Sequence, residues 1–138
     1  MERRDGIKKK LLYAVNAILP LLLGFIVYVC DRPNSYISIL VYSLTGFRSS
    51  IRFFPTIIDN HFPDFVWAYS LMFVVNIVTG IYKKNLKLSF VISVLFAVIL
   101  ELIQLFQHNM FTFDVIDIIV EIAAISLASL VIKVIERK

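Results

Sequence analysis

Two apolar stretches decide the fold: LKLSFVISVLFAVILELIQLF, residues 86–106, and DVIDIIVEIAAISLASLVIKVI, residues 114–135. Each has the length of roughly 20 residues that an α-helix needs to cross the hydrocarbon core of a bilayer. Both carry carboxylates toward one end, although a charged side chain at the centre of such a helix costs about 2.5 to 3.5 kcal/mol. Because intramembrane acids usually face a polar cavity or a partner, these acids are the best indication of function.

The composition places the chain among integral membrane proteins. Hydrophobic residues make up 59% of the 138 residues and charged residues 17%, and the mean hydropathy is +0.85. A soluble domain of this size is far less apolar, since it must cover its surface with polar groups. We therefore expect residues 1–138 to form a single membrane domain.

Four apolar runs have the length of membrane spans, and we predict an all-α, four-helix transmembrane bundle. The predicted spans are residues 11–30, 64–82, 86–106 and 114–135. Residues 35–54 are too rich in serine and arginine for a span. We expect an extra interfacial or re-entrant polar helix there, with its backbone covered by protein or lining a wet cavity.

The basic residues predict the orientation, because short loops rich in lysine and arginine stay in the cytoplasm. All but three of the 14 basic residues precede the first span, join the second to the third, or lie at the end of the fourth. Both termini should therefore be cytoplasmic, as expected for a multi-pass membrane protein with an even number of spans. The net charge of +4 then reflects topology and contact with anionic membrane lipids rather than nucleic acid.

The acids of the last two spans follow helical spacing. Glu101 and Gln104 are three residues apart, and Asp114, Asp117 and Glu121 follow the pattern i, i+3, i+7. Each set should lie on one helical stripe. Because only residues 107–113 separate the two spans, we expect antiparallel neighbours whose stripes meet at similar depth.

Helix capping is the simplest alternative for two of these acids. Asp114 and Asp117 stand where a helix begins, and carboxylates there satisfy free N–H groups and suit the positive end of the helix dipole. Glu121 lies about two turns inside, roughly 10 Å, too deep for capping. Glu101 also lies inside its helix, where the alternative is a structural partner such as Gln104, Arg48 or Arg52.

Arg48 and Arg52 are four residues apart and would share one face of the polar segment. Two interpretations stay open: they pair with the acids and close the site, or they extend to the outer headgroups. Their position on the side that is poor in basic residues favours the site.

The sequence contains no catalytic, metal or cofactor motif that would identify an enzyme. His61 and His108 lack zinc-binding spacing, so we expect both to form hydrogen bonds in loops. There is no G-x-S-x-G nucleophile motif and no P-loop. We predict no catalytic residue, no metal and no cofactor.

Three short motifs resemble the VanZ-like family of small bacterial membrane proteins. They are Pro63-Asp64-Phe65 at the start of one span, Glu101-x-x-Gln104 at the end of the next, and Asp114-x-x-Asp117 at the start of the last. Members closest to the founding protein carry a histidine a few residues after the first Asp, where this chain has Trp67 or Ala68, and Glu121 stands where the family often has Asn. The resemblance implies a cell-envelope role, linked in the founding member to low-level teicoplanin resistance, and implies no biochemical activity.

We therefore expect an outward-facing polar pocket that binds a polar headgroup, a wall precursor or a glycopeptide antibiotic. The alternatives are a small transporter or proton-coupled subunit, an enzyme acting on lipid-linked envelope substrates, and a purely structural polar cluster. The residues expected to line or close the pocket are Arg48, Arg52, Asp64, Tyr69, Glu101, Gln104, Asp114, Asp117 and Glu121.

The orientation can be tested by cysteine labelling. In a background lacking Cys30, a cysteine introduced as Asn85→Cys should resist membrane-impermeant maleimide in intact cells and react after permeabilisation, because the lysines around it hold this loop in the cytoplasm. Labelling of position 85 in intact cells would reverse the topology.

Overall fold

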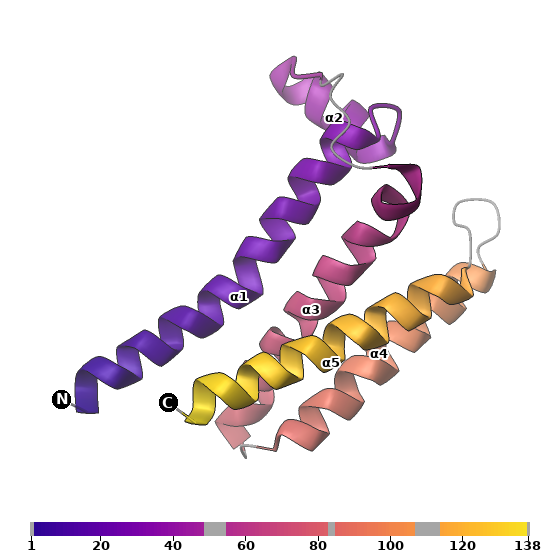
Figure 1. Ribbon diagram of the computed structural model, residues 1–138. Coiled ribbons are helices and arrows are strands. Elements are labelled where there is room, and N and C mark those ends of the chain that lie inside the picture. The colour runs from indigo at the N-terminus through magenta and orange to yellow at the C-terminus, as the bar shows by residue number, and fades with distance from the viewer. Residues whose placement is uncertain (1, 49–54, 83–84, 107–113, 138) are drawn as a thin grey trace.

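The computed structural model describes residues 2–48, 55–82, 85–106 and 114–137, which form five helices and no strand. Four of the helices, α1 (Glu2–Asp31), α3 (Thr56–Tyr82), α4 (Leu86–Phe106) and α5 (Val115–Arg137), are long and apolar enough to cross a membrane. The shorter α2 (Tyr36–Thr45) lies beside the end of α1 (Figure 1). Successive long helices run in opposite directions, so both ends of the chain lie at the same end of the bundle (Figure 1). The prediction of an all-α, four-span bundle is confirmed.

The third helix begins earlier than the sequence predicts. The expected start was residue 64, whereas α3 begins at Thr56 and contains Pro63. Proline removes only one backbone donor, so a helix can continue through it where packing holds the two flanking turns. As a result, residues 56–63 are helical, and His61 lies on a helix rather than in a loop.

The polar segment contains a short helix that is well capped at both ends. The Ser35 hydroxyl accepts a hydrogen bond from the Ser38 backbone N–H, and Gly46 ends α2 in the left-handed conformation with φ of 70°. Ten residues span about 15 Å, half the hydrocarbon thickness, so α2 does not cross a membrane. Most of its large apolar side chains are exposed.

Small residues bring the long helices close together around α3, which contacts α1, α4 and α5. Ala68, Ala97, Ala124 and Ala128 are almost completely buried, and Met72 and Phe73 fill the space beside them. Helix association in lipid depends on such close packing, because lipid tails compete for apolar contact as well as leucine does. The exposed leucine, isoleucine and valine side chains on the outer surface accordingly face the surroundings.

A polar network joins α3 to α4 in the half of the bundle that holds the termini. The Asn76 amide donates to the Ser89 hydroxyl at 3.1 Å, and the hydroxyls of Thr79 and Ser89 are 2.6 Å apart. Ser93, one turn away, donates to the Ser89 carbonyl. Such side chains hydrogen-bond across or within helices where no water is present.

The contact between α1 and α3 depends on the absence of a side chain at Gly24. A Cβ atom at this position would clash with Cγ2 of Val66, which is buried. Gly24→Ala should therefore lower the free energy of unfolding by about 1 to 3 kcal/mol, the usual cost of overpacking, measured by denaturation in detergent. Gly80→Ala is the matched control, because nothing lies within 4 Å of a Cβ there. Equal stability of the two variants would contradict this account of the helix contact.

Candidate functional site

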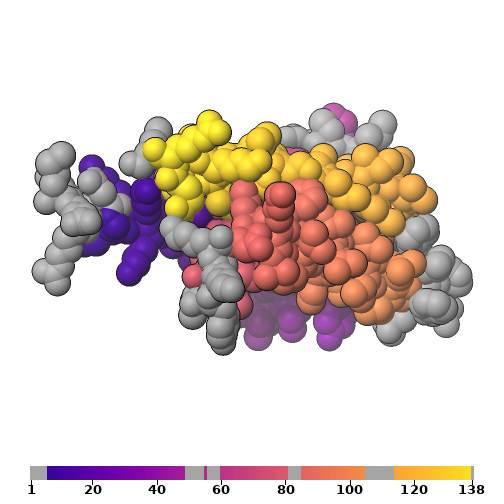
Figure 2. All heavy atoms as spheres, turned by 90° about the horizontal axis from the view of Figure 1, so that it is seen from below, coloured from indigo at the N-terminus to yellow at the C-terminus, as the bar shows by residue number. Residues whose placement is uncertain are grey.

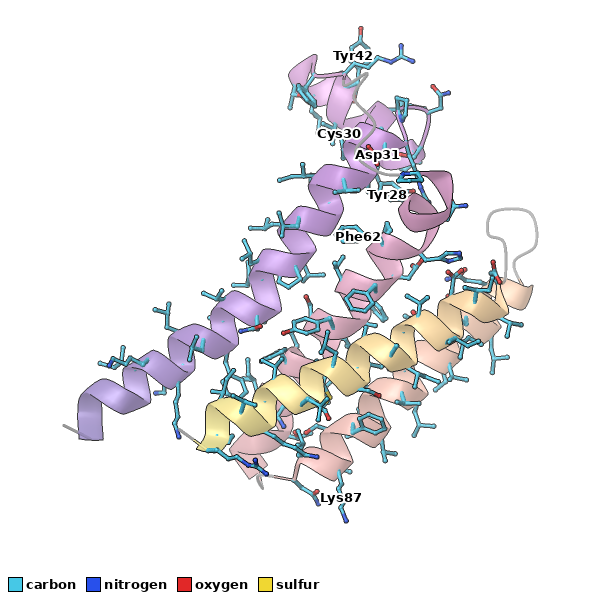
Figure 3. The ribbon with its side chains drawn as sticks, viewed as in Figure 1. Tyr28, Cys30, Asp31, Tyr42, Phe62 and Lys87 are labelled. Atoms are coloured by element: carbon cyan, nitrogen blue, oxygen red, sulfur yellow. The ribbon has the colours of Figure 1, made fainter. Side chains whose placement is uncertain are left out.

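The acidic residues gather at the end of the bundle opposite the two termini. The C-terminal ends of α1 and α4 and the N-terminal ends of α3 and α5 lie at this end, with α3 between α1 and the pair of α4 and α5 (Figure 1). Asp31 at the end of α1 lies in the same region as Phe62 near the start of α3, far from Lys87 (Figure 3). The site is therefore built from the ends of helices that are distant in sequence.

A histidine–aspartate pair links α3 to α5. His61 Nδ1 lies 2.5 Å from Asp117 Oδ1, and both side chains are mostly buried, with exposed fractions of 19% and 15%. The contact is the only one shown for the imidazole among the described residues. A short bond of this kind between a ring nitrogen and a carboxylate fixes the orientation of both side chains.

Asp114 caps α5, as the capping alternative predicts. Its Oδ1 accepts a hydrogen bond from the Ile116 backbone N–H at 2.9 Å, and its backbone carbonyl accepts one from the Asp117 N–H at 3.1 Å. Asp114 also lies beside the His61–Asp117 pair: one ligand atom from each of the three residues lies within 4.8 Å of the other two. Asp114 therefore caps α5 and belongs to the site at the same time.

Two glutamates are buried behind this group. Glu101 on α4 is 2% exposed and Glu121 on α5 is 3% exposed. The Gln104 amide donates to Glu101 Oε1 at 3.1 Å, whereas Oε2 of Glu101 and Oε2 of Glu121 have no hydrogen-bond partner among the described residues. A buried polar atom without a partner costs about 1 to 3 kcal/mol, so these two oxygens call for an explanation.

The cluster carries more negative than positive charge. Glu101 and Glu121 both interact electrostatically with Asp64 and Asp117. Asp64 also interacts with Arg32 and His61, the positively charged or chargeable groups near it. The Arg32 guanidinium in turn donates to the backbone and side-chain oxygens of Asn60. Several carboxylates thus share this end of the bundle with Arg32, the arginine shown to act on Asp64.

Two of the predicted pocket residues make other contacts. The Tyr69 hydroxyl donates to Asn16 Oδ1 at 2.7 Å and joins α3 to α1. Arg48 is exposed and donates to Asn34 Oδ1 at 3.4 Å, with no ion pair among the described residues. Arg52 lies outside the described residues. The position of Arg48 therefore does not support the prediction that arginines close the site.

The sequence predicts a loop at His61 and does not predict its part in the site, whereas His61 lies on α3 and contacts Asp117. A signal was available, because His61 and Asp64 are three residues apart and share one helical face. Expecting the helix to begin at Asp64, after Pro63, concealed that spacing.

Two grooves lie at the opposite end, between the start of α1 and the end of α5. The larger, of about 890 Å³, is lined by the basic residues Lys9, Lys10, Lys133 and Arg137, by Glu136 and Asn76, and by mostly apolar residues of α1, α3, α4 and α5. The smaller, of about 410 Å³, is lined by Lys8, Lys9 and five residues of α1 and α5. Seen from this end, the start of α1 stands to one side of α4 and α5 (Figure 2). None of the predicted site residues lines either groove.

No family model, no curated protein and no solved structure matches the chain. The similarity to the VanZ-like family therefore rests on its three short motifs alone. The positions of the carboxylates and of His61 are therefore the basis for inferring a function.

The capping role of Asp114 predicts a difference between two substitutions. Asp114→Ala should lower the free energy of unfolding by about 1 kcal/mol, whereas Asp114→Asn should be nearly neutral, since asparagine caps as well as aspartate. Denaturation of the purified protein in detergent with a chelator present measures both. If Asp114→Asn destabilises the protein as much as Asp114→Ala, capping is not what Asp114 contributes to stability.

Proposed function

We propose that the chain is a VanZ-like protein of the bacterial cell envelope, and that its acidic pocket faces the outer leaflet and binds a polar headgroup, a wall precursor or a glycopeptide antibiotic. The N- and C-termini then lie in the cytoplasm. The observation that carries the proposal is the convergence of Asp64, Glu101, Asp117 and Glu121 from three membrane-spanning helices.

The charge of the cluster favours a positively charged occupant. Carboxylates in a medium of low polarity repel one another strongly, and a cation that enters among them relieves the repulsion. Arg48, the side chain that would have suited a phosphate, is paired with Asn34 instead. An amine of the envelope ligand, or a cation bound together with it, fits the described residues better than a free anion.

The family motifs supply the link to the cell envelope. Asp64, Glu101, Gln104, Asp114 and Asp117 are the residues that carry the resemblance, and all of them lie at the same end of the bundle. In the founding member of the family this link extends to teicoplanin resistance, so a glycopeptide phenotype is the first to measure.

A transporter requires a polar route toward the other side, and the packing below the pocket argues against one. Ala124, Ile125 and Ala128 follow Glu121 along α5 and are completely buried. On α4 the next polar residue below Glu101 is Ser93, and the completely apolar Ala97 lies between them. Eight residues of helix separate Glu101 from Ser93 by about 12 Å, too far for a hydrogen bond.

The enzyme alternative has one supporting feature, the His61–Asp117 pair, since a carboxylate commonly orients a histidine that acts as a general base. Nucleophilic catalysis also requires a hydroxyl or thiol within hydrogen-bond reach of the imidazole. No such group contacts His61 among the described residues. Binding therefore remains the better supported function.

Membrane lipids are the other proposed partners. The larger groove combines four basic side chains with an apolar floor, a combination that suits an anionic headgroup and its acyl chain. Because the groove lies at the end that holds the termini, the lipid would belong to the inner leaflet in the proposed orientation.

Substitutions that preserve shape test the pocket. Glu101→Gln and Asp117→Asn should each abolish a glycopeptide or envelope-stress phenotype at unchanged protein level, because each removes a charge that the ligand needs. The double variant should be no worse than either single one, as expected for residues that act as a unit. The readouts are the minimal inhibitory concentration of teicoplanin and the amount of protein in the membrane fraction.

Asp5→Asn is the matched control, an aspartate near the start of α1 at the end that holds the termini. It should leave the phenotype intact. If Glu101→Gln and Asp117→Asn alter protein abundance alone, and do so additively, the cluster is a structural part of the helix interface and the proposed function is wrong.

A further inference from the structure

We propose that His61, Asp114 and Asp117 bind a divalent transition-metal ion such as Zn²⁺. The inference deepens the function proposed above and rests on it in one respect: the ion supplies the positive charge that the pocket requires. It also revises the expectation, drawn from sequence spacing, that the chain holds no metal.

The three side chains are close enough for one ion. Their ligand atoms lie within 4.8 Å of one another, and the two atoms of the His61–Asp117 pair are 2.5 Å apart. Zinc binds nitrogen and oxygen at about 2.0 to 2.2 Å, so in a tetrahedral site its ligand atoms are about 3.3 Å apart. Side-chain rotations that separate His61 Nδ1 from Asp117 Oδ1 by about 0.8 Å would make room for the ion.

The second observation is the Glu101 carboxylate. Its Oε2 is buried and has no hydrogen-bond partner among the described residues, and Glu101 interacts electrostatically with Asp117, Asp64 and Asp114. Glu101 is therefore a buried negative charge next to the metal-binding group, in which His61 and Asp117 keep some exposure. A bound ion would offset the negative charge that these acids place around Glu101.

The donor set favours a transition metal over Mg²⁺ or Ca²⁺. Magnesium and calcium prefer sites made only of oxygen, whereas an imidazole with carboxylates suits Zn²⁺. The proton shared by His61 and Asp117 would leave when the ion binds, because metal ligands must be deprotonated. Asp64 and Glu121 lie near enough to act on the ion electrostatically without binding it.

The test is zinc binding by the purified full-length protein. After removal of metal in detergent, titration with ZnCl₂ followed by calorimetry should show one ion bound per chain, with proton release that depends on the buffer. MgCl₂ at the same concentration should not bind. His61→Gln and Asp114→Asn should each weaken zinc binding at least about tenfold, and Asp114→Asn keeps the helix cap and therefore the fold.

Asp5→Asn is again the control and should bind zinc as the wild type does. Absence of zinc binding by the wild type, or unchanged affinity in both His61→Gln and Asp114→Asn, would overturn the proposal; in the latter case binding would come from elsewhere, for example from His108.

The two proposals fail in different ways. If the glycopeptide phenotype depends on Glu101 and Asp117 but survives His61→Gln, and no zinc binds, the pocket takes an amine and only the metal inference is wrong. If zinc binds through His61 while every pocket variant keeps the phenotype, the metal site stands and the proposed function is wrong.

Discussion

The hydrogen bond between His61 and Asp117 is the interaction on which the site depends, because it fixes the first turns of α3 and α5 relative to each other. Below it the same two helices approach through Ala68, Ala124 and Ala128, whose small side chains allow close contact but specify little about rotation or register. The His61–Asp117 hydrogen bond is directional and lies at the end of this apolar interface, so it fixes the rotation and register that the alanine packing leaves open. The depth at which Glu121 lies beside α3 follows from that register.

The four spans could be predicted from the sequence because the bilayer imposes one simple rule. A spanning segment must satisfy its own backbone hydrogen bonds over about 30 Å, so length and hydropathy alone identify the helices. The start of α3 could not be predicted in this way. Residues 56–63 are too polar to stand out from a loop, and Pro63 is usual at a helix start; their helical conformation depends on contacts with other helices.

The site residues also divide into those that the sequence could predict and those that it could not. Glu101 with Gln104, and Asp114 with Asp117 and Glu121, are close in sequence, so helical periodicity was sufficient to group them. His61 required knowledge of a contact between residues 56 positions apart, which no local pattern contains. The pairing of Arg48 with the acids stays a prediction: its charge and position favour it, and the hydrogen bond that the described residues show for Arg48 is to Asn34.

A purely structural role would leave the two buried glutamates hard to explain. A side chain that serves only the fold gains most when every polar atom is hydrogen-bonded, and glutamine would offer a donor as well as an acceptor at the same volume. Instead, Oε2 of Glu101 and Oε2 of Glu121 are buried without a hydrogen-bond partner among the described residues, and both glutamates interact with Asp64 on α3 and Asp117 on α5. Stability would favour neutral residues at both positions. A bound cation would offset this cost, because a positive charge among the four carboxylates relieves their mutual repulsion.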